Sequence, residues 1–369
     1  MLKRNWPILL GPPLVLIAAV LAVGRSDQAV IAGRVIAVQD LAPCAEPGAT
    51  AIRRPAPGTW WKTTDTLDAS GVLVGRQLFV GHGATAAAKV DLPVESSVSG
   101  PVDGIVAVTA DDGTRSQVRL VSVAARCATV IDDRDDVVRS ALIDPSDGSV
   151  LAHVVARGTR ADLGTFRISP TSGGTSEARL VAPPLGTLAG EVGTVWATVL
   201  RLDTGGTHLA VQSCADIGCL TRVFDLASEG SAPRVVRGSD QGPLLGFAGA
   251  DLVTWQACVA YPCQILAWDT STGAPRTLVT GANAATLTAN GRRLVALAAD
   301  ASGARSIAVD TATGRATGLR GIPPGTRPIG DGPAATLGLE VAADEVAMAS
   351  PGGDPLSLRP DSAAEEALP

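Results

Sequence analysis

The chain repeats one short phrase at regular intervals: FRISPTSGG at 166–174, VFDLASEG at 223–230, AWDTSTGAP at 267–275 and AVDTATGRA at 308–316. In each copy an apolar segment ends near an Asp (Ser169 in the first copy), and a turn rich in Ser, Thr and Gly follows. Asp225, Asp269 and Asp310 are separated by 44 and 41 residues. A repeat of this length predicts an array of similar small structural units.

A second phrase precedes each turn at a nearly constant distance. Its copies are SVLAHVVA, THLAVQSC, ADLVTWQAC and RRLVALAAD, and their matching residues are Leu151, Leu209, Leu252 and Leu294. Each Leu lies 16 to 18 residues before its turn motif, and Val346 in DEVAMAS is predicted to be a fifth member. Turns rich in Asp, Asn and Gly at 144–148, 203–206 and 288–291 come before these segments, as in tight hairpins. Four strands in each unit predict the blades of a β-propeller.

Between residues 100 and 360 the blade pattern resembles that of the WD-repeat and TolB-type β-propeller superfamily. This resemblance implies a ring of four-stranded blades and a tendency to bind other molecules on the loop faces. We therefore predict an all-β chain with a single propeller of seven blades over 28–360, with six blades as the alternative. The residues 361–369 are predicted to be a disordered tail.

The early region, 28–135, fits the repeat less well. Segments 71–81 and 86–93 predict one further blade, and 104–110 and 117–123 are predicted to be the second and third strands of another. The segment AVIAGRVIAVQD at 29–40 reads as a strand without a blade of its own. We expect it to complete the last blade and so to close the ring, because closure removes open sheet edges.

The N-terminus carries a membrane signal. Lys3 and Arg4 precede 18 uncharged residues, 7–24, which is close to the length that spans a bilayer. The basic flank is expected to stay in the cytoplasm. We therefore predict that residues 1–27 are a membrane anchor and that the propeller lies outside the cytoplasm. A cleaved signal peptide, with cleavage after Gly24 and secretion of the propeller, is the alternative.

Six cysteines support the same location. Cys214 and Cys219, and likewise Cys258 and Cys263, are predicted to face each other at the tip of the same hairpin in neighbouring blades, within disulfide reach. Cys44 and Cys127 remain as a third pair by elimination. An oxidising compartment favours such bridges. The alternative is a zinc site formed by the four thiolates of the two hairpins.

The sequence contains little that indicates catalysis. Its three histidines, His82, His153 and His208, lie outside any catalytic motif, and no G-x-S-x-G motif occurs. The acidic run DDRDD at 132–136 lacks the Gly and the distant Glu of a calcium loop and is predicted to be a solvated loop. We therefore expect no catalytic residue, no metal site and no cofactor.

Two kinds of function remain. A net charge of −6 argues against nucleic acid, which requires a basic surface. The predicted innermost strands, SALID, ATVLRLD, PLLGFAG, AATLTAN and ATLGLEV, are mostly apolar or small. They favour a monomeric, non-catalytic module that binds an envelope protein, peptide or glycan, on the face of the hairpins 214–219 and 258–263. The alternative is an exported hydrolase or lyase that acts on glycan or peptide material through the central channel.

Overall fold

The computed structural model describes most of the chain between residues 59 and 349, together with 36–37, 40–44 and 365–367. Gaps fall in the connections between strands, the longest at 185–194, 257–262 and 320–326. The chain divides into two units, Met1–Val35 and Ile36–Pro369. The first unit, with the predicted membrane segment 7–24, lies outside the described residues. In the part that is described, no helix is long and apolar enough to cross a membrane.

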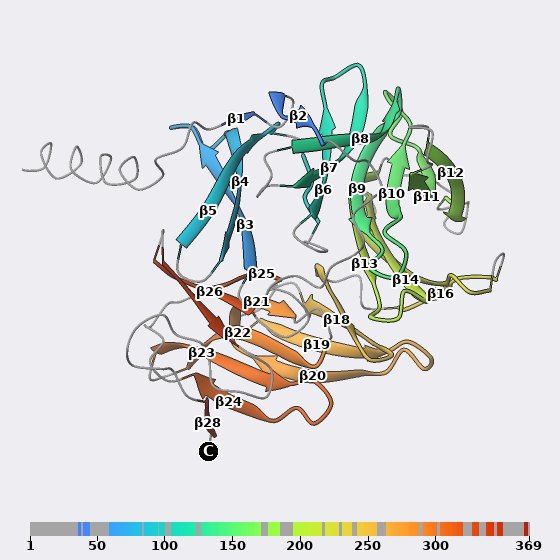
Figure 1. Ribbon diagram of the computed structural model, residues 1–369. Helices are drawn as coiled ribbons and strands as arrows, with labels where there is room; N and C mark the ends of the chain where they lie inside the picture. The colour runs from blue at the N-terminus through green and yellow to red at the C-terminus, as the bar shows by residue number, and fades with distance from the viewer. Residues whose placement is uncertain are drawn as a thin grey trace, which may run out of the picture. The chain divides into compact units, whose positions relative to one another are not determined.

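The second unit is a β-propeller with six blades of four or more strands (Figure 1), which confirms the predicted fold class. Blade 1 contains β1 (Ile36–Ala37), β3 (Thr59–Leu67), β4 (Leu73–His82) and β5 (Thr85–Leu92). Blade 2 contains β2 (Ala42–Pro43), β6 (Ile105–Asp111), β7 (Ser116–Ser122) and β8 (Cys127–Arg134). Blade 3 contains β9 (Val137–Ile143), β10 (Val150–Val155), β11 (Asp162–Pro170) and β12 (Ser176–Ala182).

Blades 4 to 6 follow the same outward order. Blade 4 contains β13 (Val195–Leu202), β14 (His208–Ala215), β15 (Gly218–Asp225) and β16 (Arg234–Val235). Blade 5 contains β17 (Leu244–Ala248), β18 (Asp251–Gln256), β19 (Gln264–Asp269) and β20 (Pro275–Thr280). Blade 6 contains β21 (Ala282–Leu287), β22 (Arg293–Asp300), β23 (Gly303–Asp310), β24 (Ala316–Leu319) and β28 (Glu365–Ala367). The predicted disordered tail, 361–369, therefore contains a short strand, which pairs with β24.

A seventh sheet of three strands lies between blade 6 and blade 1. It contains β25 (Arg327–Asp331), β26 (Leu337–Ala342) and β27 (Glu345–Ala349). Strand β25 contacts both β21 and β3. The prediction of seven blades is therefore wrong, and the alternative of six is confirmed. Val346 lies in β27, the third strand of this sheet, so the prediction that it continues the series Leu151, Leu209, Leu252 and Leu294 is wrong. The second strand of the sheet is β26, and its Leu339 lies 45 residues after Leu294.

The predicted closure of the ring by residues 29–40 is wrong. Strand β1 pairs with Val90 and Asp91 of β5, in blade 1, and not with the C-terminal sheet. Strand β2 then pairs with β8 of blade 2. Both pairings are parallel, whereas every other described strand pair is antiparallel. The physical reason is that blades 1 and 2 have only three consecutive strands each, so their outer edges are open to a strand from elsewhere.

Apolar layers between consecutive blades form the core. One cluster joins blades 1 and 2, and further clusters join each following pair up to blades 5 and 6. In the middle strand β10, Leu151 packs against blade 4 while Ala152 packs against blade 2, and all six residues of the strand are buried. The middle strands are apolar on both faces because each face meets a neighbouring blade.

The repeated Asp is a turn residue. Asp269 Oδ1 accepts hydrogen bonds from the N–H groups of Ser271 and Thr272 and from Ser271 Oγ, between β19 and β20. Asp310 makes the equivalent bonds between β23 and β24. These bonds lower the pKa of Asp269 to about 2. The repeat therefore encodes strand connections, and it carries no chemistry of its own.

Blades 2 and 3 meet in an unusual way that positions the candidate site. Ser116 pairs with Asp111, the last residue of β6, and Ser116 Oγ accepts a hydrogen bond from the N–H of Val138 at the start of β9 (3.0 Å). The innermost strand of blade 2 therefore ends where that of blade 3 begins. Segment 104–110, predicted to be a second strand, belongs to this innermost strand. Two residues, 135–136, suffice to link β8 to β9.

Close packing between blades leaves no room for a side chain at the turn glycine Gly291. Both Gly291 and Gly314 have positive φ, 68° and 72°. A Cβ atom at Gly291 would clash with the carbonyl oxygen of Phe247 in blade 5, whereas one at Gly314 would meet nothing within 4 Å. We predict that Gly314→Ala costs about 1–2 kcal/mol of unfolding free energy through its backbone conformation alone. Gly291→Ala should cost about 1–3 kcal/mol more. Equal losses in urea unfolding would show that the two blades do not approach closely there.

Candidate functional site

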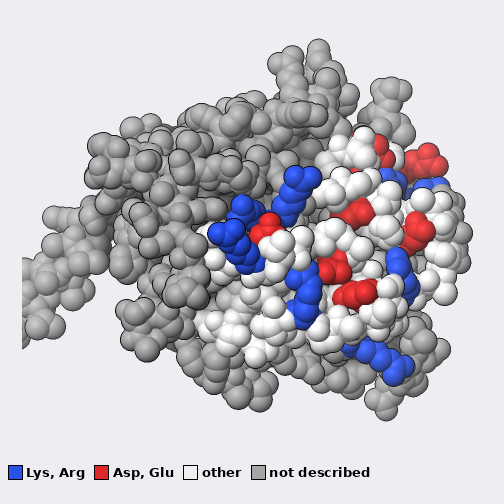
Figure 2. Space-filling model, turned by 90° about the horizontal axis from the view of Figure 1, so that it is seen from below, with Lys and Arg blue, Asp and Glu red and all other residues white. Residues whose placement is uncertain are grey.

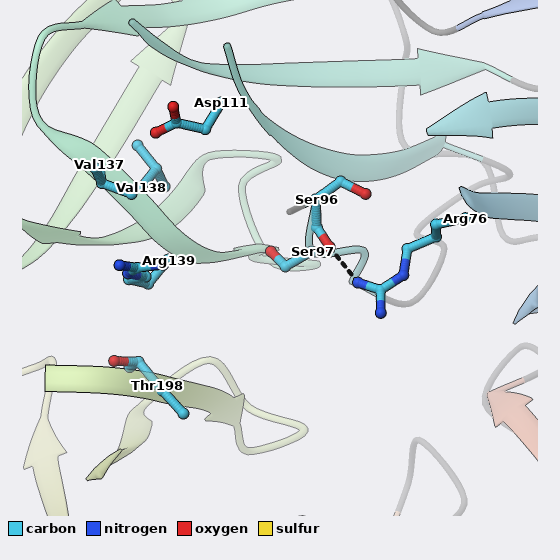
Figure 3. A pocket seen from close by; sticks show the side chains of 9 residues that line it. Arg76, Ser96, Ser97, Asp111, Val137, Val138, Arg139 and Thr198 are labelled. Atoms are coloured by element: carbon cyan, nitrogen blue, oxygen red, sulfur yellow. Dashed lines mark hydrogen bonds between the residues drawn. The ribbon is translucent and has the colours of Figure 1, made fainter. Parts of the chain in front are cut away.

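A cavity of about 280 Å³ lies among the innermost strands of blades 2, 3 and 4 (Figure 3). Asp111 ends β6, residues 137–139 begin β9, and Ala197 and Thr198 lie near the start of β13. Arg76 of β4 and the serines 96 and 97 complete the lining. This volume lies at the lower end of the range for ligand pockets.

Arg139 lies at an irregularity of strand β9. Val138 is buried in the apolar layer between blades 2 and 3. Val138 is paired with Val154 and Ser140 with His153, so Arg139 between them is the extra residue of a β-bulge, which can re-aim a side chain away from the regular pattern. Figure 3 shows Arg139, Asp111, Ser97 and Thr198 around the hollow, with Arg76 approaching from blade 1.

Two of the three charged groups in the lining are already neutralised. Arg76 forms a two-pronged ion pair with Asp65 (2.6 and 2.8 Å), and its Nη1 donates to the carbonyl oxygen of Ser96 (2.6 Å). Asp111 accepts two hydrogen bonds from Arg157 (2.9 and 3.1 Å). These bonds to Asp111 raise the pKa of Arg157. Arg139 is different: none of the described carboxylates pairs with it.

Three polar atoms of the lining are buried and have no hydrogen-bond partner among the described residues: Ser96 Oγ, Arg139 Nε and Thr198 Oγ1. Ser97 is satisfied, since its hydroxyl and its N–H both bond to Thr109 Oγ1. A buried polar group without a partner costs about 1–3 kcal/mol, so native proteins contain few of them. All three atoms belong to residues that line the cavity, and a polar ligand there would supply their partners once these side chains turn toward it.

A disulfide lies beside this cavity. In the sheet register, Ala197 is opposite Cys214 and Thr198 is opposite Ser213. Cys214 and Cys219 are bonded across the β14–β15 hairpin, with Cα atoms 3.9 Å apart. The predicted Cys44–Cys127 bridge is also present and ties the N-terminal segment to blade 2. Cys263 is in a disulfide too; its predicted partner, Cys258, lies outside the described residues.

Several connections gather at this end of the propeller. Arg157, in the β10–β11 turn, donates to the carbonyl oxygens of Gly113 and Asp135. The N–H of Val195, opposite Ala215 in the sheet, donates to the carbonyl oxygen of Arg160 in the same turn. We call this end the clamped face. It carries the turn at 112–115, the link at 135–136, the turn at 156–161 and the 214–219 bridge.

Sequence reasoning missed the charged part of the site. The predicted inner strand SALID starts at Ser140, whereas β9 starts at Val137 and therefore includes Arg139. The signal that could have found it is DDRDD itself, whose last two residues, 135–136, form the whole link between β8 and β9. Two of that run's acidic residues pair with Arg115 and a third pairs with Arg134. The described part of the chain contains no group of three His, Cys, Asp or Glu that could hold a metal ion.

The histidines lie away from the cavity. His82 is the last residue of β4, and His208 Nδ1 lies 2.9 Å from Asp203 Oδ2 at the start of β14. His153 is fully buried, with Nδ1 3.0 Å from Thr165 Oγ1 and Nε2 3.3 Å from Asp162 Oδ1. Asp162 also lies 3.5 Å from Arg222 of blade 4. This network joins blades 3 and 4 inside the core.

Figure 2 shows one face of the molecule by charge. Over the described residues, basic and acidic side chains lie among one another, and no broad area of a single charge is seen there. Binding to nucleic acid needs a basic patch or stripe. The described part of this face does not offer one.

No protein-family model matches the chain, and no curated protein matches it. Solved structures with a similar fold include a prolyl endopeptidase, which is 16% identical with a TM-score of 0.50. The match covers 79% of this chain and 47% of the endopeptidase. TolB from Acinetobacter baumannii is 10% identical with a TM-score of 0.46, over 84% of this chain and 80% of TolB. The propeller domain of the Trilobed protease from Pyrococcus furiosus is 9% identical with a TM-score of 0.48, over 86% and 96%. At these identities the likeness concerns the fold alone.

The buried network predicts a pH dependence. Burial lowers the pKa of His153 to about 4, with Arg222 acting in the same direction and Asp162 against it. The unfolded chain therefore takes up this proton at a higher pH than the folded chain does. Unfolding free energy should fall as pH decreases from about 6.5 to about 4.

His153→Gln should flatten this slope in urea unfolding. Asp269→Asn is the matched comparison, because the lowered pKa of Asp269 stabilises the folded state above pH 4 and loses that effect between about pH 4 and 2. It should leave the slope between pH 6.5 and 4 unchanged. An unchanged slope in the His153 variant would contradict a neutral buried imidazole.

Proposed function

We propose that this protein is a membrane-tethered propeller outside the cytoplasm that binds an envelope protein, peptide or glycan at its clamped face, without catalysis. The cavity with its three unpartnered polar atoms is the observation that carries the proposal, because it is built from charged and polar groups at the mouth of the innermost strands. Binding would give these atoms the partners that the protein does not supply.

The groups in the cavity support binding rather than hydrolysis. A glycosidase needs two carboxyl groups across the scissile bond, and a peptidase of the serine type needs a base beside its hydroxyl. The described lining has one carboxylate, Asp111, which Arg157 engages, and it has no imidazole. Arginine and hydroxyl groups are donors, and donors suit recognition of an anionic or carbonyl oxygen.

The disulfide beside the cavity supports the choice of this face. A bridge that closes a loop of only a few residues adds little stability through chain entropy. It does fix the position of the hairpin tip, and a preorganised tip loses less entropy when it binds. Protection of the hairpin against proteolysis is the other explanation of the bridge.

The location is inferred from two features. Disulfides form and persist in oxidising compartments, and the two described bridges are compatible with export. The uncharged segment 7–24 behind Lys3 and Arg4 has the composition of an anchor or a signal peptide.

The binding face is tested by photo-crosslinking in intact cells. The crosslinker replaces Asp135 on the clamped face, where the side chain is 87% exposed, or Thr204 in the exposed turn at the opposite end of β13. We expect a specific product from position 135 and none from position 204. External protease should remove the propeller from the same cells. Equal products from both positions, a protease-resistant propeller, or turnover of peptide or glycan substrates by the purified protein would each contradict the proposal.

A further inference from the structure

We infer that the cavity between blades 2, 3 and 4 is a carboxylate-binding site in which Arg139 is the charged partner, and that it takes the C-terminal carboxylate of a peptide with a small apolar last residue. This inference rests on the proposed binding function and specifies its ligand. It follows from the charge, the hydroxyl groups and the apolar part of the lining.

The charge balance selects an anion with one negative charge. Arg76 is neutralised by Asp65, and Asp111 is neutralised by Arg157. Arg115, Arg134 and Arg167, in the same blades, also pair with Asp residues. Arg139 alone brings an unpaired positive charge to the cavity, which leaves a local charge of +1. A carboxylate matches this charge and can accept two parallel bonds from a guanidinium.

A phosphate group fits less well. It carries close to two negative charges at neutral pH and has three acceptor oxygens. A phosphate would need a second unpaired cation, and the other arginine of the lining, Arg76, uses Nε, Nη1 and Nη2 in hydrogen bonds to Asp65 and to the Ser96 carbonyl oxygen. Phosphate would also lie close to Asp111.

Two hydroxyl groups complete the polar set. Ser96 is only 3% exposed, and its Oγ has no partner in the protein; Thr198 Oγ1 on the opposite wall has none either. Each can donate one hydrogen bond to an oxygen of the ligand. The two hydroxyl oxygens are buried, so a carboxylate held by Arg139 would accept hydrogen bonds from them after their side chains turn toward the cavity.

The rest of the lining is apolar and small. Val137 and Ala197 contribute it, next to the residues Arg139 and Thr198 in the two strands, while the Val138 side chain packs into the layer between blades 2 and 3. A volume of about 280 Å³ accommodates a carboxylate with a small side chain beside it. A peptide end with Ala or a residue of similar size fits this combination.

The walls are held in place before binding. Ser116 Oγ bonds to the N–H of Val138, next to Arg139, and the Cys214–Cys219 bridge lies on the strand opposite Thr198. These bonds fix the strands that carry two of the three ligand-facing groups. A fixed site loses little entropy on binding.

The test is a titration of the full-length protein in detergent with N-acetyl-Ala-Ala and, separately, with its C-terminal amide, followed by calorimetry or ligand-observed NMR. The acid should bind, and the amide should bind at least about tenfold more weakly, because the charge-assisted bonds to Arg139 are lost. Inorganic phosphate at the same concentration should compete poorly. Equal binding of acid and amide, stronger competition by phosphate, or no binding of the acid would overturn the inference.

Variants assign the effect to the site. Arg139→Gln should weaken binding of the acid at least about tenfold, and Thr198→Val, which keeps the shape of the side chain, should weaken it by about three- to tenfold. The matched control is Arg234→Gln, which changes an exposed arginine of β16 at the outer edge of blade 4. This variant should bind the acid as the unmodified protein does. Undiminished binding in both cavity variants would overturn the inference.

The variants also separate this inference from the proposed function. Thermal unfolding shows which variants are folded. If Arg139→Gln does not fold, Thr198→Val alone is used to test whether the cavity binds the acid. If the crosslinker at position 135 still gives its product while the acid does not bind, the clamped face is a binding face and the carboxylate inference alone fails. If the acid binds and the purified protein turns over substrates, the site is correct and the non-catalytic function fails.

Discussion

The face-to-face packing of consecutive blades is the interaction on which the rest of the structure depends. Each layer takes side chains from two sheets, so that Leu151 of blade 3 and Leu209 of blade 4 are buried in the same cluster. Five such layers join six blades. A middle strand meets a neighbouring blade on both faces, so a polar side chain on either face needs a partner. His153 is such a side chain, and Thr165 and Asp162 of the next strand lie beside it.

The same packing places the site. Strand β9 contributes to two layers, with Val138 between blades 2 and 3 and Leu142 between blades 3 and 4, and the bulge between these residues leaves Arg139 at the cavity. The innermost strand of blade 2 ends where that of blade 3 begins, and Asp111, the last residue of β6, therefore lies at the same place. Two neighbouring features, an unpaired cation and a bridged hairpin, therefore arise at one end of the propeller from the way in which the blades stack.

Sequence periodicity predicted the local parts of this fold. It found the middle strands of blades 3 to 6, the Asp turns and the partners in the Cys214–Cys219 bridge, because all of these are set by residues close in the chain. It failed where distant segments pair. No local pattern indicates that residues 36–43 add parallel edge strands to blades 1 and 2, or that β25 precedes β26 in the seventh sheet. Arg139 was missed because the start of β9 was placed three residues too late, whereas its lack of an acidic partner is visible only in three dimensions.

The central claim is that side-chain layers between sheets hold the ring together, and that the N-terminal strand only covers outer edges. Urea unfolding of a chain without residues 1–40 tests this most directly, since Leu41, β2 and the Cys44–Cys127 bridge remain. The account predicts one cooperative transition, with a slope like that of the full chain and a small loss of stability from the missing β1. A second transition, or a collapse of stability, would contradict it, because the removed strand would then be what closes the ring.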